Sequence, residues 1–196
     1  LAHAGPSAPL RAIRRAMQKS VDETNRAIFE AGAANPQLRG MGTTLVLAAF
    51  GTQRAVVGHI GDSRCYRWRG AVLELLTRDH SLLQERLDAG DLTPEQAALF
   101  PYRNLVTRAV GIERQVEVEV GEHTALMGDL FLLCSDGLSE MLDGPDIGII
   151  LSRNVSLAEK ATLLVAAAND NGGKDNISVL LAQAAGPGVR SSQGGH

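Results

Sequence analysis

Three aspartates in this sequence stand where an apolar, strand-like run meets a turn. Asp62 and Asp136 each come at the end of such a run, and Asp175 lies in a glycine-rich loop that leads into one. Glycine allows the sharp turns that these junctions need, and the adjoining strands would hold each carboxylate in a fixed place. Because carboxylate oxygens are hard ligands that suit Mg²⁺ or Mn²⁺, the three acids together predict a metal site.

The chemistry of such a site would be the activation of water. Two divalent ions about 3.5–4 Å apart can activate a bridging water and clamp a phosphoryl group for in-line attack. Zinc fits less well, because the five histidines and two cysteines show no zinc-ligand spacing. Taken alone, Asp62 or Asp136 is better explained as a turn or helix-cap residue. The coincidence of three acids at three strand ends favours a site.

Hydrophobic periodicity predicts the elements that would position these acids. Apolar residues at steps of three and four predict an amphipathic helix over 8–31 that stops at Gly32, and a capping box of Ser156 and Glu159 opens another over 156–169. A further helical segment covers 81–89. Strand patterns occupy residues 40–50, 54–61, 64–69, 72–76, 115–120 and 130–134, and a last strand follows Asp175. The turns between the early strands are too short for crossover helices, so we predict an α+β fold of two stacked antiparallel sheets flanked by helices.

The composition fits a single catalytic domain over residues 1–185, followed by a flexible Gly-, Ser- and Gln-rich tail over 186–196. A net charge of −3 argues against general nucleic-acid binding, and no apolar run approaches the about 20 residues that span a bilayer. Cys65 and Cys134 lie inside strand-like segments, where we interpret them as small buried hydrophobic residues rather than as a disulfide. Reduced cysteines favour a cytoplasmic location.

Five segments follow one another in the order GMGTT at 40–44, GHIGDSR at 58–64, LTRDHS at 76–81, CSDGL at 134–138 and KDNIS at 174–178. Together they resemble the signatures of the PPM-type (type 2C) metal-dependent serine/threonine protein phosphatases, and the bacterial members above all. The resemblance covers residues 8–183. It implies a four-layer α/β/β/α sandwich with two or three Mg²⁺ or Mn²⁺ ions between the sheets. The activity that it implies is hydrolysis of phosphoserine and phosphothreonine on proteins, by a metal-activated water and without a phosphoenzyme.

The same resemblance assigns roles to individual residues. Asp136 and Asp175 match two aspartate ligands of the central metals, and Asp62 matches the aspartate associated with a further, weaker metal. Residues 90–104, a polar stretch with two prolines and no sustained apolar period, lie where the family carries its flap, a mobile segment that influences substrate access. The partners would be phosphorylated proteins, the products of a Ser/Thr kinase.

One departure from the family pattern affects the expected activity. The family places an Arg that holds the phosphate, an acidic pair, and an Asp-Gly motif whose Asp bridges both central metals, on strands before its first long helix. The chain begins at Leu1, just before the predicted helix, and contains none of these residues or strands. We expect either that the intact protein carries this segment upstream, or that the chain is a degenerate member. In the second case it would be a catalytically impaired phosphatase-fold module that acts in binding or regulation.

Other candidate features have simpler explanations. GMGTT at 40–44 superficially resembles a phosphate-binding loop, but no Lys follows the glycines and a strand comes next. We interpret His59 and His80 as hydrogen-bonded structural histidines rather than as proton donors. Tyr66 and Trp68 alternate with arginines on one strand, and we interpret them as a core-facing pair rather than as a stacking platform.

Overall fold

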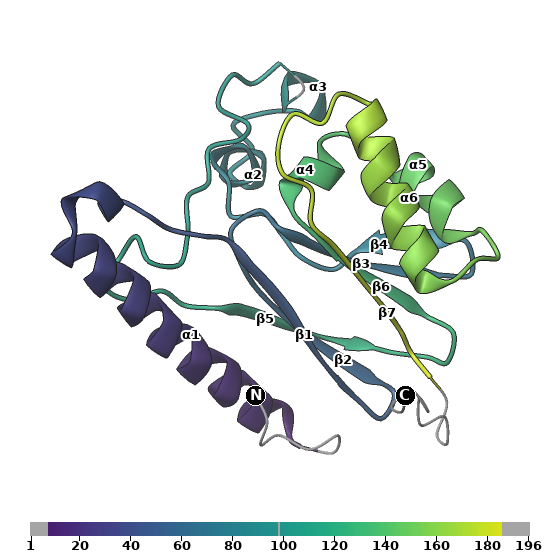
Figure 1. Ribbon diagram of the computed structural model, residues 1–196, viewed down its shortest axis with the longest axis horizontal. Helices are drawn as coiled ribbons and strands as arrows, with labels where there is room; N and C mark the ends of the chain where they lie inside the picture. Colours follow the sequence, from purple (N-terminus) through teal and green to yellow (C-terminus); the bar gives the residue numbers. More distant parts are fainter. Residues whose placement is uncertain (1–7, 98, 186–196) are drawn as a thin grey trace, which may run out of the picture.

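Two antiparallel sheets organise the chain, and the computed structural model describes residues 8–97 and 99–185 (Figure 1). The strands of the first sheet lie in the order β1 (Leu45–Gly51), β2 (Arg54–Ile60) and β5 (Glu119–Thr124). Those of the second lie in the order β4 (Val72–Leu75), β3 (Arg64–Arg69), β6 (Leu130–Cys134) and β7 (Val179–Gln183). The helices are α1 (Leu10–Ala34), the 3₁₀ helix η1 (Pro36–Leu38), α2 (Leu82–Asp88), α3 (Pro94–Ala97), α4 (Asp136–Ser139), α5 (Gly144–Leu151) and α6 (Leu157–Asp170).

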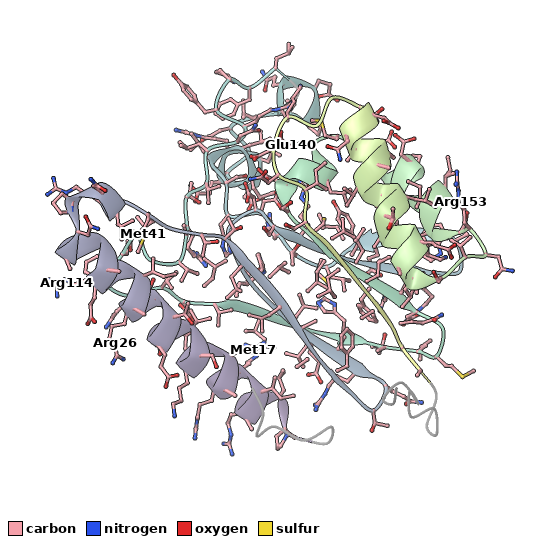
Figure 2. The ribbon with its side chains drawn as sticks, viewed as in Figure 1. Met17, Arg26, Met41, Arg114, Glu140 and Arg153 are labelled. Carbon is pink, nitrogen blue, oxygen red and sulfur yellow. The ribbon has the colours of Figure 1, made fainter. Side chains whose placement is uncertain are left out.

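Three hydrophobic clusters separate four layers of secondary structure. The first lies between α1 and the first sheet, where Met17 is fully buried and points from the helix towards β2 (Figure 2). The second joins the two sheets through residues such as Val57 and Phe131. The third packs α4, α5 and α6 on the outer face of the second sheet, around Leu138 and Leu164. The predicted α/β/β/α sandwich is therefore confirmed.

Short hairpins connect neighbouring strands, as predicted. The β3–β4 turn consists of Gly70 and Ala71, whose φ angles of 55° and 67° are the positive values that a type I′ hairpin requires. Strand β6, predicted from a continuously apolar run, is buried along its whole length. The capping box of Ser156 and Glu159 also forms as predicted at the start of α6.

The prediction of a strand over 115–120 was wrong at its start, because β5 begins only at Glu119. The segment before it pairs with the side chains of α1 instead of with a strand. The Gln18 amide donates to the carbonyl of Val116 at 2.9 Å and accepts from the amide of Val118 at 3.1 Å. About two turns further along α1, the buried side chain of Asn25 accepts a hydrogen bond from the amide of Gly111 at 2.7 Å. The sequence alternates here although residues before Glu119 form no strand, because Val116, Val118 and Val120 all face the core beneath α1.

Several other boundaries differ from the predictions. The first strand begins at Leu45 rather than Gly40, and α1 runs through Gly32 to end at Ala34. Helices α4 and α5 were not predicted, since each is short and rich in glycine or interrupted by polar residues. The predicted flexible tail over 186–196 lies outside the described residues.

Candidate metal centre

The strand register brings the three predicted aspartates to one edge of the sandwich. Arg64, the first residue of β3, pairs with Cys134, the last residue of β6, and Cys134 also pairs with Val179 at the start of β7. Asp62 therefore precedes β3, Asp136 follows β6, and Asp175 precedes β7 at the same end of the second sheet. The pattern of apolar residues predicted each strand, but only the register shows that the three junctions coincide.

Asp62 is held by a turn that only glycine can make. Gly61, which joins β2 to Asp62, has a φ of 99°, and a Cβ at this position would lie 2.4 Å from Cγ2 of Thr44. Thr44 is itself fixed by a hydrogen bond of 2.8 Å between its hydroxyl and that of Ser63. The backbone on either side of Asp62 is thus fixed by packing and hydrogen bonding.

Ser135 ties the loops of Asp136 and Asp175 together. Its hydroxyl donates to the carbonyl of Asn176 at 3.1 Å and accepts from the amide of Ser178 at 3.0 Å, and its own amide donates to the carbonyl of Ser178 at 3.1 Å. Gly137 permits the close approach, because a Cβ there would lie 2.5 Å from the same carbonyl of Asn176. Asp175 itself lies in this loop, four residues before β7 begins, and its side chain accepts from the amide of Asn176 at 2.6 Å.

Asp136 is shared by two depressions in the surface. A cavity of about 430 Å³ is lined by Asp62 and Asp136, and a second of about 540 Å³ is lined by Asp136 and Asp175. The structure therefore brings the predicted site residues together in pairs, with Asp136 common to both. Asp62 and Asp136 are half-buried, whereas Asp175 is exposed.

The electrostatics of the first cavity favour the arrival of a cation. Burial, the nearby carboxylate of Asp136 and, to a lesser extent, that of Asp79 together raise the pKa of Asp62 to about 6. Like charges held together in a half-buried site cost free energy unless a proton or a cation neutralises them. Oxygen donors in this arrangement fit Mg²⁺ or Mn²⁺ by their chemistry.

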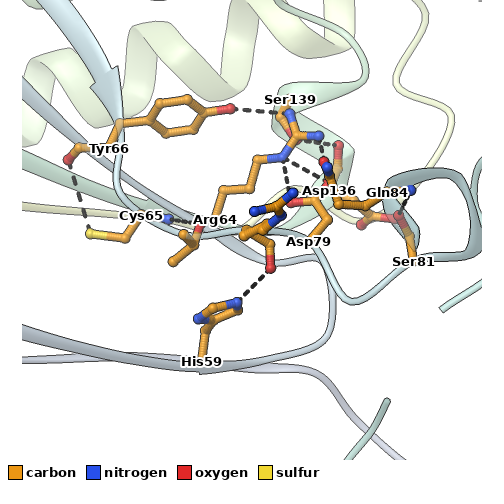
Figure 3. Close-up of polar contacts among 11 residues, drawn as sticks. His59, Arg64, Cys65, Tyr66, Asp79, Ser81, Gln84, Asp136 and Ser139 are labelled. Atoms are coloured by element: carbon orange, nitrogen blue, oxygen red, sulfur yellow. Dashed lines mark hydrogen bonds and ion pairs between the residues drawn. The ribbon is translucent and has the colours of Figure 1, made fainter. Parts of the chain in front are cut away.

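Arg64 does little to neutralise Asp62 and Asp136, because its guanidinium is paired with Asp79. The guanidinium forms a two-pronged ion pair, with Nε 2.9 Å from Oδ1 of Asp79 and a terminal nitrogen 2.6 Å from Oδ2 (Figure 3). Its other terminal nitrogen donates to the hydroxyl of Tyr66 at 3.2 Å. This hydrogen bonding to Asp79 raises the pKa of Arg64, so the guanidinium keeps its charge.

Sequence reasoning missed the other polar residues of the first cavity. Asp79, Ser139 and Glu140 line it beside the two aspartates. Asp79 lies within the LTRDHS segment, so its type and place were visible, but its pairing with Arg64 depends on how the 76–81 loop folds back on β3. Glu140 follows the short helix α4, which the sequence pattern did not reveal.

A second group of possible ligands, His59, His80 and Glu119, is explained by hydrogen bonding. His59 Nε2 lies 2.7 Å from the carbonyl of Arg78 and must carry a proton, since a carbonyl only accepts. His80 Nδ1 accepts from the amide of Gly61 at 3.1 Å, which places the ring proton on Nε2, 3.2 Å from Glu119. The Nε2 atoms of both rings thus carry protons and Nδ1 of His80 is already bonded, so in this state the two stacked rings do not offer two free nitrogen lone pairs to one ion. This confirms the interpretation of both residues as structural histidines.

The remaining interpretations of single residues also agree with the structure. Cys65 and Cys134 are both free and buried, and burial raises the pKa of each thiol to about 12. Tyr66 belongs to the core cluster beneath α4, α5 and α6, and Trp68 packs against it. None of the helices in the described part of the chain is both long enough and apolar enough to cross a membrane.

Four layers of this topology, with aspartates gathered at one edge, define the class to which the sequence signatures pointed. The chain belongs to the protein phosphatase 2C family, whose model matches residues 2–181. Phosphatases of this family use Mg²⁺ or Mn²⁺.

Curated and solved relatives agree with this assignment. The chain is 40% identical over 167 residues to the serine/threonine phosphatase stp of Listeria monocytogenes serotype 4b, a match that covers 85% of this chain and 66% of the relative. It therefore spans just under two thirds of that relative's length.

Among solved structures, a serine/threonine phosphatase of S. agalactiae is 39% identical, with a TM-score of 0.84 over 88% of this chain and 71% of that chain. The catalytic domain of the serine/threonine protein phosphatase PstP, solved in complex with two manganese ions, is 34% identical. Its TM-score is 0.81 over 94% of this chain and 77% of that one.

Proposed function

We propose that the intact protein removes phosphate from phosphoserine and phosphothreonine on other proteins, in a reaction that depends on Mg²⁺ or Mn²⁺. The observation that carries the proposal is the placement of Asp136, which lines one cavity with Asp62 and another with Asp175. An acid shared between two such places is suited to a centre that holds more than one cation. The activity of the family's named relatives supports the choice of reaction and substrate.

In this proposal Asp136 and Asp175 hold one ion, and Asp62 holds a further, weaker one. When bound, divalent cations lower the pKa of water and neutralise the charge that develops on a phosphoryl group. The protein's own contribution is to fix the carboxylates. Ser135 anchors the loops of Asp136 and Asp175, and the Arg64–Asp79 ion pair lines the same cavity as Asp62.

We also propose that residues 90–104 act as a flap over the first cavity. This segment contains the short helix α3, and three of its residues, Ala97, Arg103 and Asn104, line the same cavity as Asp62 and Asp136. Such a position would let the segment influence which phosphorylated segments enter. Limited proteolysis should cut within 90–104 before any strand of the two sheets, and protection of this segment by a bound phosphopeptide would support the role.

The test is turnover of phosphoserine and phosphothreonine peptides by the full-length protein across a Mn²⁺ titration, with EDTA as the metal-free reference. Asp136→Asn should lose nearly all activity, and Asp175→Asn should behave alike. Asp170→Asn serves as the matched control, because this exposed acid at the end of α6 lines neither cavity. Unchanged turnover in Asp136→Asn at low Mn²⁺, or binding of phosphopeptide without hydrolysis by the wild type, would contradict the proposal.

The natural partners in this proposal are proteins phosphorylated by a Ser/Thr kinase of the same cell, and the reaction takes place in the cytoplasm. The two buried, reduced cysteines support that location, since disulfides are rare there.

A further inference from the structure

We infer that His80 is a positioning residue for Asp62, because it forms hydrogen bonds with both backbone polar groups of Gly61, the residue before Asp62. This inference rests on the proposed function, in which Asp62 holds a cation. His80 makes no contact with the cavity that Asp62 lines and lies behind it, beneath the turn.

The contact consists of two hydrogen bonds to one glycine. The backbone amide of His80 donates to the carbonyl of Gly61 at 3.0 Å, and the amide of Gly61 donates to Nδ1 of the His80 ring at 3.1 Å. Both polar backbone groups of Gly61 are therefore bonded to a single residue 19 positions away in the sequence. Asp62 follows immediately, so the direction in which its side chain leaves the turn depends on this contact.

The ring is held so that only one tautomer fits. His80 is 8% exposed and stacks on His59 with ring centres 4.6 Å apart. Because Nδ1 accepts a hydrogen bond, the proton lies on Nε2, where the Glu119 carboxylate is the acceptor at 3.2 Å. A terminal nitrogen of Arg108 lies 3.3 Å from the same atom. The carbonyl of His80 accepts from the amide of Thr107 at 2.9 Å, which anchors the residue to a third segment.

Packing leaves the turn no other conformation in which to hold Asp62. Gly61 has a positive φ and lies against Thr44, as described above, so the turn cannot relax by moving towards β1. Mg²⁺ and Mn²⁺ tolerate little error in the place of a ligand, and a ligand needs to be held to within about 0.5 Å. Loss of the Nδ1 acceptor would therefore weaken the binding of the ion at Asp62 without changing any residue that lines the cavity.

Two amide substitutions separate this role from general packing. In His80→Asn the side-chain oxygen can occupy the place of Nδ1 and accept from Gly61, whereas in His80→Gln the amide group lies further out. Mn²⁺ binding to the full-length protein would be measured by calorimetry and electron paramagnetic resonance, beside the Mn²⁺ dependence of turnover. We expect His80→Gln to weaken the weakest Mn²⁺ site at least tenfold and to leave the tighter sites unchanged, and His80→Asn to stay within threefold of the wild type.

Non-additivity provides the second arm. In a protein that already carries Asp62→Asn, His80→Gln should have no further effect on Mn²⁺ binding, because the ligand that it positions is gone. Equal losses in the Asn and Gln variants, or additive losses with Asp62→Asn, would overturn the inference. If Asp62→Asn weakens Mn²⁺ binding and His80→Gln does not, the inference fails while the proposed function stands. If the wild type binds Mn²⁺ but hydrolyses no phosphopeptide, the proposed function fails, and the binding data still decide the role of His80.

A variant at the half-exposed Glu119 keeps the test valid if His80→Gln does not fold. In Glu119→Lys the acceptor of the Nε2 proton is lost, and only donors face Nε2: the new ammonium group and the Arg108 guanidinium, 3.3 Å away. This arrangement favours the ring proton on Nδ1, against the amide of Gly61. We expect the same selective loss of the weakest Mn²⁺ site. Glu117→Lys, at an exposed position two residues earlier, controls for the added positive charge. Equal effects of the two lysine variants would contradict the inference.

Discussion

The two ends of β3 carry similar ion pairs in different electrostatic surroundings. At the end near the cavity Arg64 forms a two-pronged pair with Asp79, and at the far end Arg69 forms one with Asp129, each with a closest distance of 2.6 Å. Around Arg69 the charges balance, since Arg67 is paired with Glu74 beside it. The cavity at the other end is lined by four carboxylates and two guanidinium groups, Asp62, Asp79, Asp136, Glu140, Arg64 and Arg103.

This difference separates a cluster whose charges stabilise the fold from one whose charges oppose it. Hydrogen bonds from Arg69 lower the pKa of Asp129, so its charge stabilises the fold. Burial and the neighbouring Asp136 raise the pKa of Asp62, so its charge opposes the fold. A carboxylate whose ionisation lowers the stability of the fold is a candidate for a binding role, because stability does not account for its presence.

The largest expected effect is that of Asp136→Asn on turnover. Loss of the shared carboxylate should lower metal-dependent hydrolysis by more than about 100-fold. Mutation of a residue that only supports a metal ligand already costs up to about 100-fold, and Asp136 is proposed to bind the metal directly. In the absence of metal the variant should melt no lower than the wild type, because a repulsion with Asp62 is removed. Phosphopeptide assays and thermal melting in EDTA measure the two results. A marked loss of metal-free stability would mean that Asp136 is a structural acid like Asp129.

Asp129→Asn should show the reverse pattern. The Asp129 carboxylate is buried, accepts two bonds from Arg69 and a third from the amide of Leu126 at 2.7 Å, so its loss should cost about 1–3 kcal/mol of unfolding free energy. Turnover per folded molecule should not change. Urea unfolding at pH 7 gives the free energy, and a variant as stable as the wild type would show that this balanced cluster contributes nothing.

The pH dependence of stability should also differ between the two ends. The pKa of Asp129 is lowered on folding. The stabilisation from its charge is therefore fully present above the unfolded pKa of 3.8, and it is lost as the pH falls from there through the lower pKa of the folded state. The pKa of Asp62 rises from 3.8 to about 6, so its effect on metal-free protein is the opposite: stability is lost as the pH increases from about 4 to 6.

Mn²⁺ should therefore raise the melting temperature more at pH 7 than at pH 5, where Asp62 is protonated. In Asp62→Asn this difference should shrink, while the tighter ions still bind. Melting curves at both pH values, with EDTA as the reference, measure the effect. An unchanged difference in the variant would show that another group competes with the metal for protons.

The smallest expected effect is that of Glu74→Gln. Glu74 is half-exposed, so its ion pair with Arg67 is screened by water and salt, and the change should cost less than about 1 kcal/mol. Urea unfolding beside Asp129→Asn would place the two pairs on one scale. A loss as large as that of Asp129→Asn would indicate that the far-end charges act as one network.

Much of the fold could be predicted because local patterns agreed with it. β3 and β6 have the predicted bounds, since alternating or continuous apolar runs and short turns determine them. The segment 115–118 was misassigned because its partner is the amide side chain of Gln18 on α1, about 100 residues away in the sequence, and no local pattern reports such a contact. Strand pairing shows which junctions coincide, and hence that Asp136 is shared, but sequence spacing does not.

The amide contacts of α1 have a consequence for the order of folding. Gln18 and Asn25 bond to residues 86 to 100 positions later, so the docking of α1 cannot be completed until the chain has been synthesised through Val118. The β1–β2 and β3–β4 hairpins need only their neighbours and close earlier, since short loops cost less entropy. During synthesis the amphipathic face of α1 therefore waits exposed while the sheet that will cover it forms. On the ribosome, α1 emerges before the strands of the first sheet but completes its docking after them.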